Sequence, residues 1–435
     1  MKNIGFERIL AWFVFLYFIR ILLDRLLALY NILIGKTILD YRIFDISDWL
    51  INYEGGFTRR GLLGQILWEI EQLHLYDVRM AISIICLFAS IVLLFFVLRV
   101  FKEEGWSFLI LPTGFIFGFT LFRLGGRRDM LSLLLTYVLF FLFEYIVYRP
   151  GKKSVGWLLF YLISLFQILM HEASFFYVFP ILMLTYLMEL KKNQKSFCKN
   201  SLLCLLHFVP IFLTMAAVCL FKGDPLTAEI IWNSWEKVFS SFPCNSDTTV
   251  IGEGVDALTW GTKDTFVNHL KASYIGSHSP SYMLIPLSIF NLLASYLLVS
   301  RINTVDMGII RKRQMNNVLM SNILLIQFIA MIPMFTILSC DWGRTIPYWL
   351  LSSMFFYHIY KNEKIDFLCL TKVSQKIQKG ISQNRILSNN YTYIILTLLT
   401  PIPWSGAPFD FANTFQQGMI KFLQNDLDHF IAFFS

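Results

Sequence analysis

The stretch GGRRDMLSLLLTYVLFFLFEYIVYR, residues 125–149, decides the fold of this chain. Its apolar part, residues 130–148, contains a single charged residue, Glu144, and is long enough to cross the hydrocarbon core of a bilayer as a helix. A glycine pair and an arginine pair precede the apolar part, and Arg149 follows it. This pattern predicts a transmembrane helix with charged groups at both rims.

The composition extends this prediction to the whole chain. Of its 435 residues, 56% are hydrophobic and only 15% are charged, whereas a soluble globular protein carries about 25% charged residues. We therefore expect one all-α integral membrane domain over residues 1–435, a polytopic bundle of about eleven spans of roughly 20 residues each. The expected spans are 8–34, 79–99, 106–122, 130–148, 155–170, 173–189, 201–221, 281–300, 316–339, 345–360 and 391–404.

Basic clusters between the spans predict the orientation. They alternate with sparsely basic segments, which is the positive-inside pattern and places the N-terminus in the cytoplasm. The net charge of +8 then reports orientation, and no nucleic-acid partner is expected. Residues 36–78 and 222–280 become outer loops, and residues 361–390 become a basic cytoplasmic loop. A single tilted span over 155–189 would invert everything after it, but basic clusters at both ends favour two spans.

The first outer loop is predicted to hold two amphipathic interfacial helices, over residues 44–53 and 58–74. Gly55-Gly56 breaks the chain between them. Arg59 and Arg60 open the second helix and are candidates for binding a phosphate or substrate. Asp45 and Asp48 are three apart, so a helix would place both carboxylates on one face. Either could act as a general base, or they could form a solvated, helix-capping turn.

Three further charged motifs interrupt apolar runs on the same predicted side. Arg127, Arg128 and Asp129 open an outward-starting helix after a glycine pair, which suits a phosphate, although arginines also anchor to lipid headgroups. Ionisable groups at membrane depth are costly and are usually functional. The second motif is His171-Glu172, which could be a proton carrier with its orienting acid or a polar cap on a tight hairpin. The third is Asp341, Trp342 and Arg344, which could contact an anion and a sugar ring or anchor the chain at the membrane interface.

The sequence contains no cysteine or histidine spacing that indicates a metal or redox site. No cofactor is therefore expected, although the carboxylates leave a divalent metal open as an alternative.

The layout resembles the GT-C superfamily of integral-membrane glycosyltransferases. The resemblance covers an inside N-terminus, a long first outer loop of two interfacial helices with an early carboxylate, and cationic residues on later outer loops. It implies that Asp45 or Asp48 is the catalytic base and that Arg127, Arg128, His171 and Arg344 contact the phosphate of a polyprenyl-linked sugar. The acids are spaced D-x-x-D rather than adjacent, so which of them is the base stays open. More loosely, the chain resembles O-antigen and capsule polymerases.

Transfer of a sugar from a lipid (pyro)phosphate needs a base for the acceptor hydroxyl and cations for the leaving phosphate. We therefore expect a glycosyltransferase of cell-surface polysaccharide synthesis, in the bacterial inner membrane, with its active face in the periplasm or outside the cell. Its partners would be the lipid bilayer, a polyprenyl-linked sugar donor and a glycan or lipid-linked acceptor. The alternatives are a repeat-unit polymerase and a flippase or transporter of a lipid-linked anion.

Overall fold

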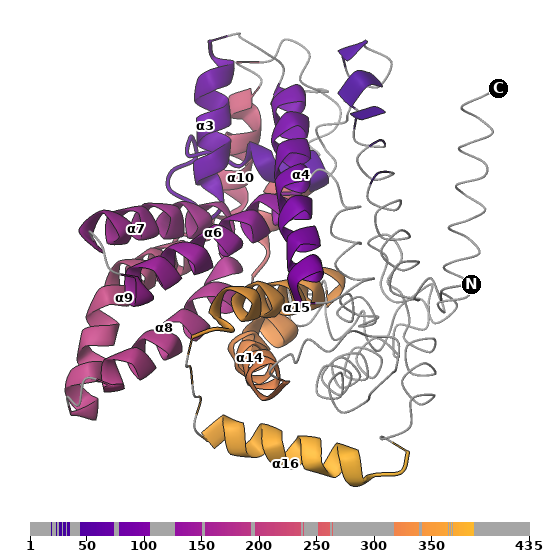
Figure 1. Cartoon of the computed structure of the whole chain (residues 1–435). Helices are drawn as coiled ribbons and strands as arrows, with labels where there is room; N and C mark the ends of the chain where they lie inside the picture. Colours follow the sequence, from indigo (N-terminus) through magenta and orange to yellow (C-terminus); the bar gives the residue numbers. More distant parts are fainter. Residues whose placement is uncertain are drawn as a thin grey trace, which may run out of the picture.

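The computed structural model describes residues 44–73, 78–104, 127–149, 153–192, 196–235, 251–261, 317–338 and 342–386, apart from single positions within these ranges, and isolated positions elsewhere. These residues form an all-helical structure (Figure 1). The longer helices are α4 (Val78–Glu104), α6 (Asp129–Tyr148), α7 (Lys153–Met170), α8 (Ser174–Lys192), α9 (Phe197–Leu220), α14 (Asn317–Ala330), α15 (Trp342–Tyr360) and α16 (Cys369–Gln383). The predicted spans 8–34, 106–122, 281–300 and 391–404 lie largely or wholly outside the described residues.

Within the described residues, five helices are long and apolar enough to cross a membrane: α4, α6, α7, α8 and α9. Apolar side chains on the exposed surface of this bundle, such as Phe88, Leu162 and Leu213, fit a lipid environment. The segment 155–189 contains two such helices, as the basic clusters favoured. Two helices in one segment agree with the predicted hairpin. The other six of the eleven predicted spans are not among these five helices and stay predictions.

The bundle core lies between α6, α7, α8, α9, α14 and α15 and is rich in aromatic contacts. Phe140 of α6 meets Phe356 of α15 edge to face, and Phe143 packs in the same way on Trp157 of α7. Rings in this arrangement attract one another beyond the area that they bury. The helices are therefore fixed relative to one another.

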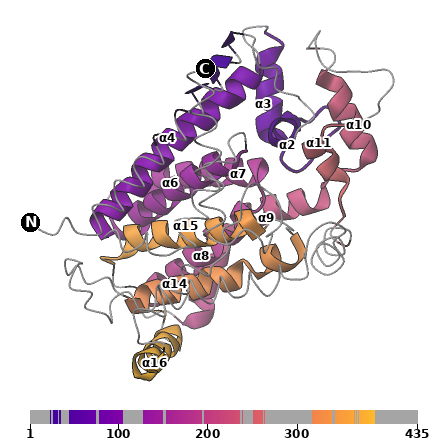
Figure 2. The same ribbon diagram turned by 90° about the vertical axis from the view of Figure 1, so that its right-hand side faces the viewer.

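A second core lies at one end of the bundle, in a cap that surrounds the start of α4. The cap consists of short helices that pack around two buried tryptophans, Trp49 and Trp235. Figure 2 shows them on the side of the molecule away from α16. They are α2 (Phe44–Ser47), the 3-10 helix η1 (Asp48–Leu50), α3 (Gly61–Glu71), α10 (Pro225–Ser234), α11 (Glu253–Asp256) and the 3-10 helix η4 (Ala257–Thr259).

The two outer loops of the sequence prediction hold this cap together. Trp235 Nε1 donates a hydrogen bond to the carbonyl of Leu50 at 2.7 Å, and Asn52 Nδ2 donates to Ser234 Oγ at 2.8 Å. The backbone of Gly254 donates to Ser47 Oγ at 2.8 Å, beside Asp48. Helices therefore occur within both ranges expected for the first outer loop. Their position at a membrane interface stays a prediction.

Gly64 allows α3 to approach η1 closely. A Cβ atom there would lie 1.8 Å from the carbonyl oxygen of Ile51, which is backbone and cannot rotate away. We predict that Gly64→Ala lowers the thermal unfolding temperature of the purified protein, because overpacking of this kind costs about 1–3 kcal/mol. The matched control is Gly380→Ala in α16, where a Cβ would meet nothing within 4 Å. Equal unfolding temperatures for the two variants would show that this contact does not limit stability.

Candidate functional site

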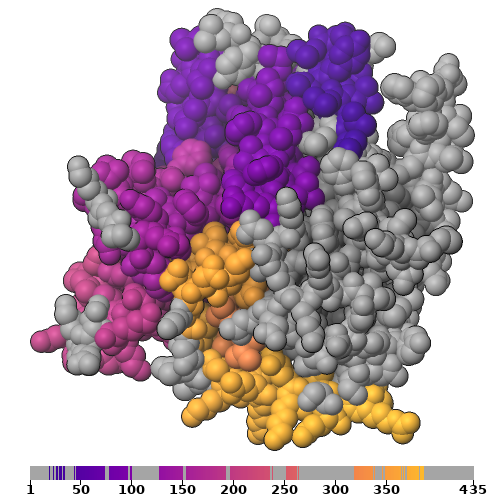
Figure 3. All heavy atoms as spheres, in the orientation of Figure 1, coloured from indigo at the N-terminus to yellow at the C-terminus, as the bar shows by residue number. Residues whose placement is uncertain are grey.

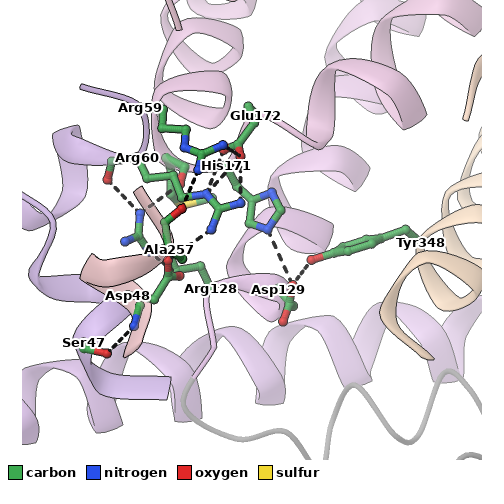
Figure 4. Close-up of polar contacts among 12 residues, drawn as sticks. Ser47, Asp48, Arg59, Arg60, Arg128, Asp129, His171, Glu172, Ala257 and Tyr348 are labelled. Atoms are coloured by element: carbon green, nitrogen blue, oxygen red, sulfur yellow. Dashed lines mark hydrogen bonds and ion pairs between the residues drawn. The ribbon is translucent and has the colours of Figure 1, made fainter. Parts of the chain in front are cut away.

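The candidate site lies at the seam between the bundle and the cap, where several helix ends meet (Figure 4). Arg128 and Asp129 stand at the start of α6. His171 and Glu172 form the turn between α7 and α8. Asp48, Arg59 and Arg60 come from the cap, so residues more than 100 positions apart converge here.

Arg60 and Glu172 form a forked ion pair across the seam. Arg60 Nη2 donates to Glu172 Oε1 at 2.7 Å, and Arg60 Nε donates to Oε2 at 2.9 Å. Burial opposes ionisation of Glu172, but the nearby charge of Arg60, supported by Arg59, outweighs burial and holds the pKa of Glu172 well below its usual range. Arg60 also has a left-handed backbone, with φ of 64°, a conformation that non-glycine residues rarely adopt. The pair therefore fixes an unusual turn immediately before α3.

Asp48 contacts two arginines, Arg60 of the cap and Arg128 of the bundle. Its Oδ1 lies 3.4 Å from Arg60 Nη1, and its Oδ2 lies 3.1 Å from Arg128 Nε. Only 5% of Asp48 is exposed. Both carboxylate oxygens thus face guanidinium groups, so the geometry gives Asp48 the task of positioning arginines. This differs from the open carboxylate that a general base requires.

Arg128 is 1% exposed and is held largely by carbonyl groups. Its Nη1 donates to the carbonyl of Arg60 at 2.8 Å and to that of Met170 at 2.9 Å, and its Nη2 has no hydrogen-bond partner among the described residues. Burial lowers the pKa of Arg128, and the charge of Asp48 partly offsets this effect. A buried donor without a partner is costly. Arg128 therefore offers a donor to a ligand.

Arg59 offers a second such donor. Its Nη2 donates to the carbonyl of Ala257 at 2.6 Å, and its Nη1 lies 4.0 Å from Glu172 Oε1. Its Nε is buried and has no hydrogen-bond partner among the described residues. Three guanidinium groups therefore face two carboxylates, Asp48 and Glu172. The charge of Asp129 also acts on Arg128, so the unused guanidinium donors, rather than a surplus of charge, suit the site to an anion.

A second polar group lies beside the first, around Asp129. Tyr348 of α15 donates a short hydrogen bond to Asp129 Oδ1, and His171 Nε2 lies 3.8 Å from the same oxygen. The ring of Tyr177 stacks on that of Tyr348, with centroids 4.7 Å apart. A carboxylate that contacts both a histidine and a phenol can hold or pass a proton. The sequence analysis missed Tyr348, because it lies in an apolar run that predicts only a span.

The remaining predicted residues are not placed in either group. The guanidinium of Arg127 lies over the ring of Phe44, 4.9 Å from its centroid. The backbones of Asp45, Trp342 and Arg344 belong to α2 and α15, but their side chains lie outside the described residues, as does Asp341. The carbonyl of Ala257 was also missed, because a backbone acceptor leaves no signal in a side-chain pattern.

The described residues contain no group of three or more histidine, cysteine, aspartate or glutamate side chains placed to hold a metal ion. The nearby carboxylates instead face arginine, tyrosine and histidine. The geometry of this part of the chain therefore points to the arginines as groups that would meet an anion.

Comparisons of the chain with models of known protein families, with curated proteins and with solved structures find no match.

The Arg60–Glu172 pair makes a specific thermodynamic prediction. In a double-mutant cycle with Arg60→Gln and Glu172→Gln, we expect a coupling free energy toward the upper part of the usual range of about 0.5–3 kcal/mol. Because the folded-state pKa of Glu172 is depressed, the coupling should be complete well above the ordinary carboxyl pKa of about 4.3 and should fade as the pH falls through the lower folded-state value. Unfolding in detergent at several pH values measures it.

The exposed pair Lys192–Glu189, 2.6 Å apart, is the control for this cycle. Exposed pairs typically contribute about 0.2–1 kcal/mol. A coupling at Arg60–Glu172 no larger than that of the control would contradict its role in joining the cap to the bundle.

Proposed function

We propose that this protein is a membrane glycosyltransferase. It would move a sugar from a polyprenyl-(pyro)phosphate donor to a glycan or lipid-linked acceptor on the outer face of the bacterial inner membrane, in cell-surface polysaccharide synthesis. One observation carries the proposal: at the end of an apolar bundle, buried donors of Arg128 and Arg59 have no hydrogen-bond partner among the described residues. A lipid-linked phosphate needs such cationic donors next to an apolar surface.

In the proposed reaction, the acceptor hydroxyl attacks the anomeric carbon of the donor sugar. The bond between that carbon and the phosphate oxygen breaks, and its electron pair stays on the phosphate. Arg59 and Arg128 would stabilise this developing charge, because preorganised donors in a water-poor site act strongly on charge that grows in the transition state. The neighbouring helix start at α6 adds its dipole.

The proton of the acceptor hydroxyl needs a base. Asp48 faces two guanidinium groups, so we assign it the positioning of Arg60 and Arg128. Two candidates remain for the base: Asp45, three residues earlier in the same loop, and His171 with Asp129 beside it. An Asp45→Asn variant that retains full activity while His171→Gln loses it would assign the base to the histidine.

A matched pair of arginines tests the proposal. Arg128 stands at the start of α6, and Arg149 stands at its end, where it is exposed and pairs with Glu144 at 2.8 Å. In a host strain that lacks the chromosomal gene, we predict that Arg128→Gln lowers surface-glycan synthesis by about a hundredfold, as expected for the loss of one transition-state donor. Arg149→Gln should restore synthesis to the wild-type level.

Electrophoresis of lipid-linked and surface glycans provides the measurement, with membrane levels of each variant checked by immunoblot. Full synthesis by a normally expressed Arg128→Gln variant would contradict the proposal. Accumulation of single repeat units in the deletion strain would favour the alternative of a repeat-unit polymerase that uses the same cationic site.

The alternative of a transporter or flippase has one observation in its favour. A buried polar set continues from the site into the bundle: Tyr177 and Ser132 hydroxyls lie 2.6 Å apart, and Gln167 Nε2 donates to Thr136 Oγ1 at 2.9 Å. Polar side chains between spans also serve simply to join helices. If the chain moves its substrate without chemistry, Gln167→Leu should stop the crossing of a labelled lipid-linked sugar, and no new glycosidic bond should form in the wild type.

A further inference from the structure

The helix α16 has an unusual composition for this chain. It spans Cys369–Gln383, contains three lysines and has no aspartate or glutamate. Lys372, Lys376 and Lys379 are spaced by four and three residues, so they share one helical face, and all three are exposed. Leu370, Val373, Ile377 and Ile381 follow the same spacing on another face. The sequence analysis treated this segment as a loop and did not find the helix.

The contacts of α16 fix which side of it faces the protein. Ser374 Oγ donates to Asn322 Oδ1 of α14 at 2.6 Å, and Asn322 Nδ2 donates to Thr371 Oγ1 at 3.0 Å. Ile381 is buried on the same side. These contacts hold the helix by one flank. On the other side of the helix, the three lysines and Val373 are exposed.

The position of α16 suits the surface of a membrane. It runs across the view in Figure 1 and is seen nearly end-on in Figure 2, whereas α14 is seen nearly end-on in Figure 1 and runs across Figure 2, so α16 packs crosswise to α14. In the space-filling view it forms the lower edge of the molecule (Figure 3). It lies at the end of the bundle away from the cap and its arginines. A helix in this orientation would lie in the plane of a bilayer crossed by the expected span 316–339, of which α14 is part.

Apolar side chains are exposed on α16 and just beyond it, which favours contact with lipid over contact with water alone. Val373 is 46% exposed on the face next to the lysines, and Ile386 just beyond the helix is 69% exposed. An in-plane helix buries such side chains at the boundary of the acyl chains while its lysines extend to the headgroups. Lysines in this position attract anionic lipids at about 1 kcal/mol each.

We propose that the face of α16 formed by Lys372, Lys376 and Lys379 binds the headgroups of anionic phospholipids, in the leaflet opposite the arginine cluster. The occupant is the lipid bilayer itself. This inference stands apart from the proposed sugar transfer, because it uses no residue of the candidate site. Binding there would hold the α14–α16 corner of the bundle at the membrane surface.

The test compares two triple variants with equal loss of charge. The first is Lys372→Gln, Lys376→Gln and Lys379→Gln, and the control is Lys153→Gln, Lys191→Gln and Lys199→Gln, whose lysines are also exposed, at the ends of α7, α8 and α9. The purified, delipidated proteins are titrated with phosphatidylglycerol and with phosphatidylcholine, and bound lipid is counted by native mass spectrometry. A third variant replaces the α16 lysines with arginine.

The α16 glutamine variant should bind phosphatidylglycerol about fivefold more weakly for each lysine removed, at low salt, with phosphatidylcholine binding unchanged. The control variant should lose much less phosphatidylglycerol affinity than the α16 glutamine variant, and the arginine variant should restore binding. Unchanged phosphatidylglycerol binding by the glutamine variant would overturn the proposal, as would an equal loss in the control. If the glutamine variant unfolds, weak binding by a folded arginine variant would overturn it as well.

Discussion

Two of the ion pairs that cross the seam among the described residues, Arg60 with Glu172 and Arg128 with Asp48, connect the two hydrophobic cores. Neither core alone specifies how the cap sits on the bundle, because apolar contacts are not directional. The forked pair and the buried guanidinium of Arg128 supply that direction. Arg128 also supplies one of the seam's unused guanidinium donors, so the constraint that orients the cap also shapes the candidate site.

The sequence analysis considered one pair of acids, Asp45 and Asp48, as the catalytic base, whereas the structure has two separate polar groups, one around Asp48 and Glu172 and one around Asp129. Asp48 and Glu172 neutralise and orient arginines, and that task explains why they are buried. In the proposed reaction, proton transfer would fall to groups outside these pairs, of which Asp129, with Tyr348 and His171 around it, is the one that the structure describes most fully. Two neighbouring polar groups with different tasks suit a reaction that needs a cationic site and a base.

The sequence predicts local features of the fold well. Residues 130–148 lie in α6, and the hairpin at 155–189 appears as α7 and α8, because hydropathy and basic clusters report burial in lipid directly. Asp48, Arg128 and Glu172 converge in one cluster, and the side of the membrane on which they lie stays a prediction. The partners could not be predicted: Arg60 and Glu172 are 112 residues apart, and only packing brings them together. Tyr348 lies in an apolar run that predicts only a span. The segment 361–390 is basic throughout, so its charge alone does not indicate the lysine face of α16.

Imaging of a bound ligand tests the central claim most directly. The protein, reconstituted in nanodiscs with a polyprenyl phosphate, can be examined by electron cryomicroscopy at a resolution that shows side chains. The account predicts density for the phosphate within hydrogen-bond distance of Arg59 Nε and Arg128 Nη2, with the Arg60–Glu172 pair intact. A phosphate bound elsewhere, with this seam closed and unoccupied at saturating lipid, would contradict it.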